Sequence, residues 1–320
     1  MNKFIHYCFA LLSILLFTVA CESKSTMTIS IDKQLTLLDI PSASGIENVG
    51  ESLWVIGDDS PFIFQMNKDY DIQNKYAISN GLNMEQLERT ISKNEKKDFE
   101  AMTLIDWEGE KCLFLFGSGS KSPQRNEGLL MSLKGSVLET YDLSDFYALI
   151  QEKAKLDNRD FNIEAATILD DKLYLFNRGK NKLISMKTKH FVDYISGKKE
   201  SIKIKANTIE LPSLNGVKAG FSGATTDIEN KRILFSASVE NTSNWVDDGA
   251  VYGSYIGMIV PDQLQHHYTP VCTLLEKDKT LLIKVESLTV LKSSKEQTIV
   301  VAVTDSDGSA SELLEVTIGN

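Results

Sequence analysis

Phe99-Glu100-Ala101-Met102-Thr103-Leu104 and Ile163-Glu164-Ala165-Ala166-Thr167-Ile168 are two copies of one short pattern. Each copy reads apolar residue, Glu or Ser, small residue, any residue, Thr, and usually an aliphatic residue. Further copies are Phe221–Thr226, Val285–Val290 and a shorter one beginning at Ala43. The second position, which we call the slot, is occupied by Ser44, Glu100, Glu164, Ser222 and Glu286. Successive slots are 56, 64, 58 and 64 residues apart, and this near-even spacing indicates five structural repeats.

A second apolar run follows each copy, and a third strand-like run follows the second. The second runs are Leu53–Ile56, Leu113–Phe116, Leu173–Phe176, Ile233–Phe235 and Ile299–Val303. β-Branched and aromatic runs bounded by turn residues are typical of strands. Repeated units of three or four consecutive strands are typical of propeller blades. We therefore expect an all-β fold, a five-bladed β-propeller forming a single domain over residues 27–320.

Six blades are the alternative to five, and the sixth would have to lie in 141–158 or 188–212, where strand signals are few. Met84–Glu95 and Leu143–Leu156 instead carry apolar residues at three- and four-residue spacing, which predicts short helical inserts between blades. The strand-like segment from Thr28 to Leu38 has no blade before it. We expect it to supply the outer strand of the last blade, which would close the ring and remove an exposed sheet edge.

The N-terminus predicts export. Phe4–Ala20 is an almost unbroken apolar run, typical of a signal-peptide core. Thr18-Val19-Ala20-Cys21 resembles the lipobox of bacterial lipoproteins, although that motif usually carries Leu where Thr18 stands. We expect residues 1–20 to be removed, Cys21 to carry the lipid (palmitate or a related acyl chain), and 21–26 to form a linker. The expected location is the cell envelope, with the chain anchored to the outer membrane on its periplasmic or surface face. An ordinary signal peptide or a single membrane anchor is the alternative.

Composition narrows the classes of partner. The net charge is -10, and basic residues form no patch, which argues against a nucleic-acid partner. Cys112 and Cys272 lie in apolar stretches, where buried free thiols are expected, and no Cys/His spacing indicates zinc. We expect a monomer that contacts the membrane only through its lipid.

Propeller geometry predicts which side chains converge. The first strand of a blade begins at the end of the ring where the second strand finishes, so the slot residues lie near the loops that follow the second strands. We call this end the mouth. The charged residues expected there are Asp58, Asp59, Glu100, Arg125, Glu164, Arg178, Glu240, Glu286, Asp305 and Asp307.

Two kinds of chemistry fit such a mouth. Carboxylates that face one another repel unless a cation lies among them, and calcium accepts six to eight oxygen ligands, so Glu100, Glu164 and Glu286 are candidate calcium ligands. Alternatively, Arg125 and Arg178 would clamp a phosphate or carboxylate of a ligand. The remaining candidate ligand-binding residues are Asp58, Asp59, Ser44 and Ser222.

Structural roles are the competing interpretation. A slot glutamate would cap backbone N–H groups of the adjacent blade, and the small residue after it would allow close packing. The threonines three residues after each slot, at 103, 167, 225 and 289, are expected to be structural. Asp58 and Asp59, and likewise Asp305 to Gly308, fit the composition of tight turns.

Several of these segments resemble a known group of proteins. Ser44–Glu47, Asp98–Ala101, Gly57–Pro61, Gly117–Arg125 and Phe176–Gly179 are similar to segments of uncharacterised β-propeller lipoproteins of Bacteroidetes. That group is in turn distantly similar to phytase-like and SdiA-regulated propellers. The resemblance implies a propeller outside the cytoplasm and no established activity.

Two functions follow as hypotheses. The first is a lipid-anchored propeller that binds a small molecule, glycan or protein partner at its mouth. The second is a calcium-dependent hydrolase of phosphoesters or lactones at the same place, as the phytase-like resemblance suggests. The sequence contains no nucleophile motif, so catalysis would rest on carboxylates and a cation. Whether the protein is an enzyme stays open at this stage.

Overall fold

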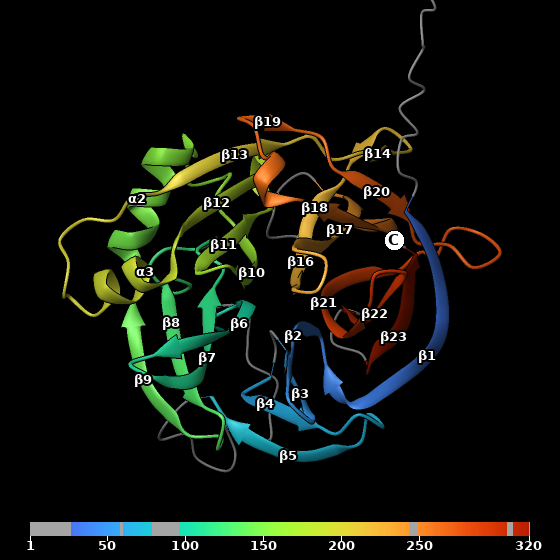
Figure 1. The fold of residues 1–320 in the computed structure, drawn as a ribbon, viewed down its shortest axis with the longest axis horizontal. Helices are drawn as coiled ribbons and strands as arrows, with labels where there is room; N and C mark the ends of the chain where they lie inside the picture. Colours follow the sequence, from blue (N-terminus) through green and yellow to red (C-terminus); the bar gives the residue numbers. More distant parts are fainter. Residues whose placement is uncertain (1–26, 58–59, 79–95, 243–248, 306–309, 320) are drawn as a thin grey trace, which may run out of the picture.

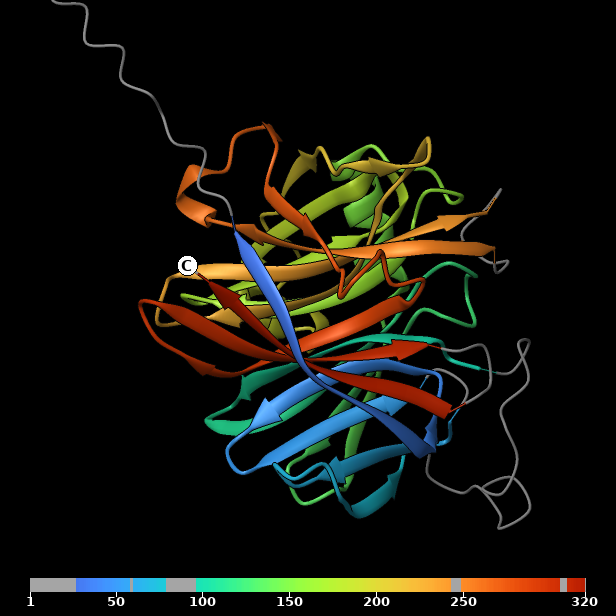
Figure 2. The same cartoon turned by 90° about the vertical axis from the view of Figure 1, so that its right-hand side faces the viewer.

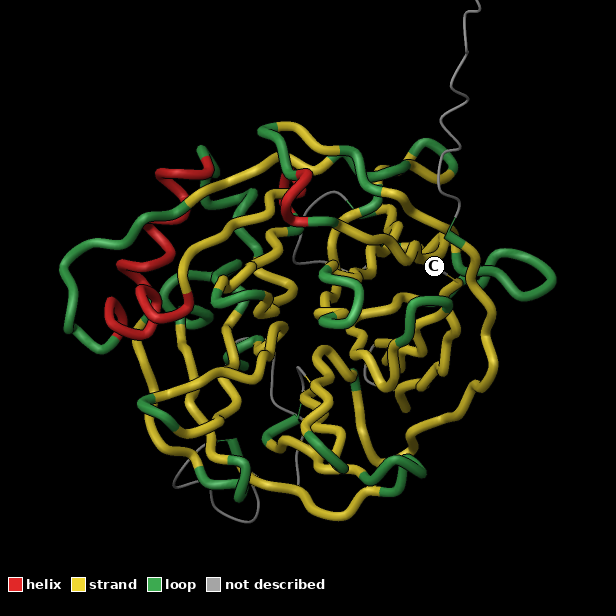
Figure 3. The backbone as a smooth tube through the Cα atoms, in the orientation of Figure 1, coloured by secondary structure: helices red, strands yellow, loops and turns green. Residues whose placement is uncertain are grey.

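The computed structural model describes residues 27–57, 60–78, 96–242, 249–305 and 310–319. Figure 1 shows five sheets arranged in a ring around a central axis, which confirms the five-bladed β-propeller. Each blade is an antiparallel sheet whose first three strands follow the chain from the axis outward, and blade 3 gains one parallel strand at its rim. Figure 3 shows that strands make up most of the ring and that the helices gather on one side.

The blades are built from consecutive strands. Blades 1 and 2 consist of β2 (Ala43–Val49), β3 (Ser52–Gly57), β4 (Phe62–Met66) and β5 (Ile72–Ala77), then β6 (Phe99–Trp107), β7 (Glu110–Gly117), β8 (Glu127–Ser132) and β9 (Val137–Asp142). Blade 3 consists of β10 (Ile163–Leu169), β11 (Lys172–Asn177), β12 (Lys182–Lys187), β13 (Lys205–Ile209) and β19 (His267–Tyr268).

Blades 4 and 5 complete the ring. They consist of β16 (Gly220–Asp227), β17 (Arg232–Asn241), β18 (Ala250–Ile259) and β20 (Val271–Leu274), then β21 (Lys284–Ser293), β22 (Gln297–Asp305), β23 (Ala310–Gly319) and β1 (Thr28–Pro41). Smaller elements connect the strands: a hairpin of β14 (Ser213–Leu214) and β15 (Val217–Lys218), and 3-10 turns at Gly179–Asn181 and Pro261–Gln263.

The N-terminal strand closes the ring as expected. β1 pairs antiparallel with β23, with Thr28 opposite Gly319 and Leu37 opposite Ser311. Figure 2 shows β1 running along the outside of blade 5. The last blade therefore takes its outer strand from the start of the chain, so this edge of the sheet is paired rather than exposed.

The core is divided among the interfaces between blades. Five clusters of buried apolar side chains each join two adjacent blades. Within β3, Trp54 and Ile56 pack toward blade 2, whereas Val55 packs toward blade 5. Because side chains alternate between the faces of a strand, a strand buried on both faces must be apolar at every position. This explains the unbroken apolar second runs of the sequence.

Every inner strand has a β-bulge at the slot. In β6, Phe99 pairs with Gly117 and Ala101 with Phe116, so Glu100 between them has no partner on β7. The same register shift occurs at Ser44, Glu164, Ser222 and Glu286. Bulges change the direction of a side chain and recur beside functional sites. The shared pattern in the sequence is therefore a shared bulge, which gives the five slot residues equivalent places at the mouth.

One of the two predicted helical inserts is confirmed. α2 (Ser144–Ala154) lies within the predicted segment Leu143–Leu156, whereas Met84–Glu95 lies outside the described residues. A second helix, α3 (Thr188–Ile195), was not predicted and lies in one of the segments considered for a sixth blade. Both helices cover the interface of blades 2 and 3, where Phe146 and Phe191 pack together with ring centroids 5.1 Å apart. Among the described residues, no helix is both long and apolar enough to cross a membrane.

Candidate functional site

The register of the inner strands brings the slots to the mouth. Phe99, Ile163 and Val285, each one residue before a slot glutamate, pair with Gly117, Asn177 and Thr304 at the ends of the second strands. The slot residues therefore lie at the same end as the loops that follow the second strands. The side chains at this end form two ionic clusters and a set of hydrogen bonds between blades.

Arg178 links blades 3 and 4. It follows β11 directly, and its side chain is only 6% exposed. Its Nη1 donates to Ser238 Oγ at 2.9 Å, and its Nη2 lies 3.1 Å from Glu240 Oε2. Nη1 also lies 3.9 Å from Oε2 of the slot residue Glu164. The predicted anion-binding arginine is thus engaged by two carboxylates of the protein itself.

Lys284 extends this arrangement to blade 5. Its Nζ lies 2.8 Å from Oε1 of the slot residue Glu286 and 3.7 Å from Glu240 Oε2, so Glu240 is shared between the two cations. Asp305 Oδ2 lies 3.9 Å from the same Nζ. These contacts define one mouth network across three blades, consisting of Glu164, Arg178, Glu240, Lys284, Glu286 and Asp305.

The mouth network holds more carboxylates than cations. Burial raises the pKa of Glu164 to about 8, and the positive charges of Arg178 and Lys284 only partly offset it. Burial also raises the pKa of Glu286, again against the opposing effect of Lys284 and Arg178. Glu100 contributes to the negative field around Arg178. Near neutral pH, protonation of Glu164 would relieve part of this excess negative charge.

The second cluster surrounds Asp98. Arg125 Nη1 lies 2.5 Å from Asp98 Oδ2, and Lys96 Nζ lies 3.2 Å from Oδ1. Ser118 also donates to Asp98, and Ser120 Oγ accepts a hydrogen bond from Arg125 at 2.8 Å. All three charged side chains are nearly inaccessible to solvent. Arg125, predicted to bind an anionic ligand, therefore compensates a buried aspartate and fixes the loop after β7.

The two slot serines make equivalent bonds between blades. Ser44 Oγ donates to the carbonyl oxygen of Phe99 at 2.9 Å, and Ser222 Oγ donates to that of Val285 at 2.6 Å. In both cases the acceptor is the residue just before the next slot. Both serines are buried, so their hydroxyl protons connect one blade to the next.

The small and threonine positions of the pattern also join blades. A Cβ on Gly223 would lie 2.6 Å from Ser287 Cα and 2.9 Å from the carbonyl oxygen of Glu286, so blades 4 and 5 approach too closely for a side chain there. Thr289 Oγ1 accepts the N–H of Asn48 at 3.0 Å. Thr225 Oγ1 accepts the N–H of Val290 at 3.3 Å. These contacts support the structural interpretation of both positions.

Some predicted site residues cannot be placed. Asp58, Asp59, Asp307 and Cys21 lie outside the described residues. Among the residues that are described, no group of three or more His, Cys, Asp or Glu side chains is arranged to hold a metal ion. Glu164 and Glu286 have basic side chains beside them instead, so the calcium hypothesis gains no support from this geometry. Cys112 is a buried free thiol, as expected, whereas Cys272 is a free thiol that is half-buried.

The sequence reasoning missed Asp98, Asn162 and Lys284, although they share a simple signal. Each lies two residues before a slot glutamate. The amide Nδ2 of Asn162 donates to Glu164 Oε1 at 2.7 Å, as Lys284 does to Glu286 at 2.8 Å. Extending the repeat by two residues upstream would have found all three.

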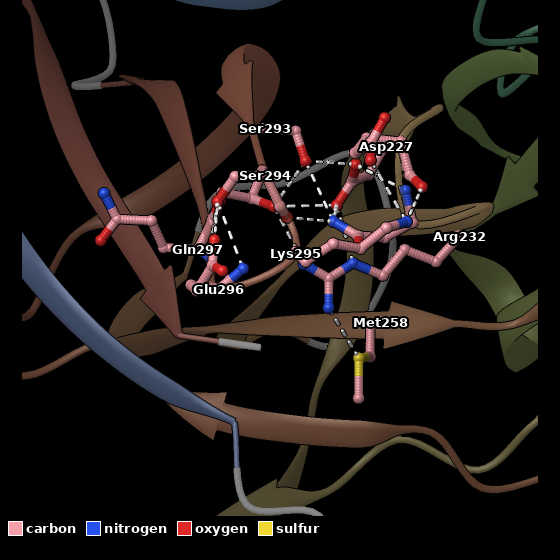
Figure 4. A network of polar contacts seen from close by, with 11 residues as sticks. Asp227, Arg232, Met258, Ser293, Ser294, Lys295, Glu296 and Gln297 are labelled. Carbon is pink, nitrogen blue, oxygen red and sulfur yellow. Dashed lines mark hydrogen bonds and ion pairs between the residues drawn. The ribbon is translucent and has the colours of Figure 1, made fainter.

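A third polar cluster lies at the opposite end of the propeller (Figure 4). Asp227, at the end of β16, accepts hydrogen bonds from Arg232 Nε at 2.8 Å, Ser293 Oγ at 2.6 Å and Thr298 Oγ1 at 2.9 Å. Burial alone would raise the pKa of Asp227, but these bonds and that of Asn230 lower it. The cluster joins blade 4 to blade 5, and it provides hydrogen-bond donors for the buried carboxylate of Asp227.

A groove of about 640 Å³ also lies at this opposite end, between the β6–β7 hairpin and α3. Its charged groups pair locally at the surface, as Lys111 does with Asp106 at 3.6 Å and Lys189 with Asp193 at 3.3 Å. Its Asp193 side chain is 12% exposed and lies beside both Lys189 and Lys199, so this carboxylate is already compensated.

Together the fold and the mouth define a five-bladed β-propeller with a buried ionic network at one end of its axis. The chain belongs to the family of unknown function DUF6929, whose sequence profile matches residues 39–318. No curated protein shows significant sequence similarity to it.

Several solved structures are similar to this chain at low sequence identity. Glutaminyl cyclase of Myxococcus xanthus is 10% identical over 92% of this chain and 97% of that one, with a TM-score of 0.50. The tail fibre of Staphylococcus aureus phage P68 is 11% identical over 92% of this chain and 53% of that one, with a TM-score of 0.47. A DUF4221 member from Bacteroides vulgatus is 11% identical over 92% and 99%, with a TM-score of 0.34. At 10% identity, the similarity to the glutaminyl cyclase concerns the fold alone.

Proposed function

We propose that this protein is a lipid-anchored propeller of the cell envelope that binds a small ligand at its mouth. The mouth network is the observation that carries the proposal. Burying an ion costs several kcal/mol, and apolar residues of similar size stabilise a core at least as well as a buried ion pair. Five interfaces of this propeller are already packed with apolar side chains, so the fold does not require charges at the axis.

The location of these charges favours a site. They gather at one end, on loops and bulged strand starts, and the pKa of Glu164 is strongly raised, as is common at functional sites. A small molecule fits better than a broad protein or glycan surface, because Glu164, Arg178 and Glu286 are buried and the other charges of the network are at most 17% exposed, rather than spread over an exposed face. The alternative function, a calcium-dependent hydrolase, requires a metal site that the described side chains do not form.

The proposed location in the cell envelope depends on a lipid anchor at the N-terminus. The proposal takes Cys21 as the lipidated residue after removal of residues 1–20, as the lipobox-like sequence indicates. Labelling expressed protein with an alkyne-bearing fatty acid tests it, and Cys21→Ser is expected to abolish the label. Retention of the label in that variant would contradict lipidation at this position.

Ligand binding is tested by thermal-shift screening of the mature chain against a library of small metabolites and sugars. Glu164→Gln removes the charge while keeping the shape and the acceptor for Asn162. Glu229→Gln, on an exposed hairpin at the opposite end, is the matched control. A compound that stabilises wild type and the control but not Glu164→Gln is expected. A library without any such compound would contradict the proposal.

A further inference from the structure

The charge balance of the mouth network indicates what kind of ligand it lacks. Among the described residues, the carboxylates of Glu164, Glu240 and Glu286 share two cations within 4 Å, Arg178 and Lys284. Glu164 is the most weakly paired of the three, because its Oε2 lies 3.9 Å from Arg178 Nη1. A ligand that adds negative charge would worsen this balance, whereas a positive ligand would improve it.

Asn162 supplies an independent observation. Its side chain is buried, with the residue 5% exposed, and Nδ2 donates to Glu164 Oε1 at 2.7 Å. Its Oδ1 is also buried and has no hydrogen-bond partner among the described residues. A buried acceptor without a donor destabilises the fold, because it loses its hydrogen bonds to water without replacement. Such exceptions are few in native proteins and call for an explanation.

The orientation of this amide is fixed by its neighbour. When Glu164 is ionised, as it would be beside a bound cation, turning the amide over would place Oδ1 against the carboxylate, and two acceptors would then face each other. Nδ2 must therefore point toward Glu164, which leaves Oδ1 available beside the same carboxylate. The backbone N–H of Asn162 donates to Asn177 Oδ1 at 2.8 Å and holds the residue in place.

We propose that the mouth binds the primary ammonium group of a small organic ligand, which donates to Asn162 Oδ1 and Glu164 together. This inference rests on the proposed function and specifies its ligand class. An ammonium group carries one positive charge and three N–H donors, which match the two deficits of the site. A metal ion fits less well, because it would need several carboxylates around one point. An anion fits less well, because Arg178 and Lys284 already contact carboxylates.

The inference is tested by titrating the mature chain with n-propylammonium, 1,4-diaminobutane, propionate and calcium chloride, using isothermal calorimetry at fixed ionic strength. We expect the two amines to bind and propionate not to. Glu164→Gln and Asn162→Leu are each expected to weaken amine binding at least tenfold, and Glu229→Gln to leave it unchanged. The circular dichroism spectrum and melting temperature show whether each variant is folded.

The outcomes separate this inference from the proposed function. Binding of propionate or a neutral compound that Glu164→Gln abolishes would overturn the ammonium inference and keep the mouth as a binding site. Amine binding that survives both mouth substitutions would also overturn it, since the amines would then bind elsewhere. Failure of every amine and of every library compound would overturn both. Calcium binding lost in Glu164→Gln would favour the metal hypothesis instead.

Discussion

Arg178 Nη2 lies 3.1 Å from Glu240 Oε2, and both side chains are only 6% exposed. This ion pair crosses from the loop after β11 to the end of β17, so it joins blade 3 to blade 4 at the mouth. Because Glu240 also faces Lys284 at 3.7 Å, the pair connects blade 3 to blade 5 through a single carboxylate. The mouth network is therefore one electrostatic unit, and changes in one blade should affect the others.

Removing the central cation should destabilise the fold. Arg178→Met leaves Glu164 and Glu240 buried without their guanidinium partner, and breaking a buried pair in this way costs about 3–5 kcal/mol. Arg178→Met combined with Glu240→Gln should recover part of that loss, since one of the stranded charges is gone. Urea denaturation measures both. A loss below about 1 kcal/mol for the single variant would mean that the pair is not buried as described.

The slot serines should contribute to stability at separate interfaces. Ser44→Ala and Ser222→Ala each remove one hydrogen bond to the next blade, with an expected cost of about 1 kcal/mol. Because the two serines lie at different interfaces, their effects should add within about 0.5 kcal/mol. Unfolding free energies of both single variants and the double variant test this. Unchanged stability together with lost ligand binding would instead assign the serines to the ligand.

Gly223 should not tolerate a side chain. Gly223→Ala places a Cβ against the backbone of Ser287 and Glu286, and such overpacking costs about 1–3 kcal/mol. Ala165 holds the same position in blade 3, and Ala165→Gly is the matched control, with an expected cost of about 1 kcal/mol or less. Thermal unfolding compares the two. A Gly223→Ala variant as stable as wild type would show that the blades can separate at no cost.

Glu47 should make stability depend on pH. It takes the threonine position of the pattern in blade 1, and burial raises its pKa from 4.5 to about 8. Between these values the folded chain keeps a proton that the unfolded chain releases, so the free energy of unfolding falls as the pH rises. Glu47→Gln removes this contribution. Between pH 5 and pH 8 the free energy of unfolding of the variant should rise by about 1–2 kcal/mol relative to wild type. The full effect of a pKa shift is ~1.4 kcal/mol per pKa unit. We expect less than the full effect, because the side chain of Glu47 is only partly buried.

Denaturation at several pH values between 5 and 8 measures this difference. Glu229→Gln, at an exposed carboxylate, should show no such gain. Parallel pH profiles for wild type and Glu47→Gln would contradict a raised pKa at this position.

Much of the fold could be predicted from the sequence because each blade repeats the same local demands. The slot pattern marks a bulge, the apolar second runs mark strands buried on both faces, and the N-terminal strand had no other sheet to join. α3 was missed because eight residues give too short a pattern to distinguish from an irregular connection. This helix is stabilised by Phe191, which packs against Phe146 of α2, a residue distant in the sequence.

The candidate site was predicted less fully. Its location at the slot end followed from propeller geometry. Arg178, Glu164 and Glu286 do belong to one network there. The contacts themselves did not follow, because ion pairs such as Arg178 with Glu240 join residues in different blades. Arg125 and Arg178 were expected to face a ligand, but the carboxylates of Asp98 and Glu240 contact them. Only the packed structure shows which charges are already compensated.

The most direct test is a crystal structure of the mature chain grown with the amine that binds most tightly. We expect electron density for the ligand at the mouth, with its nitrogen within hydrogen-bond distance of Asn162 Oδ1 and Glu164. Ligand density at another place, such as the groove beside α3, with the mouth unoccupied, would contradict it.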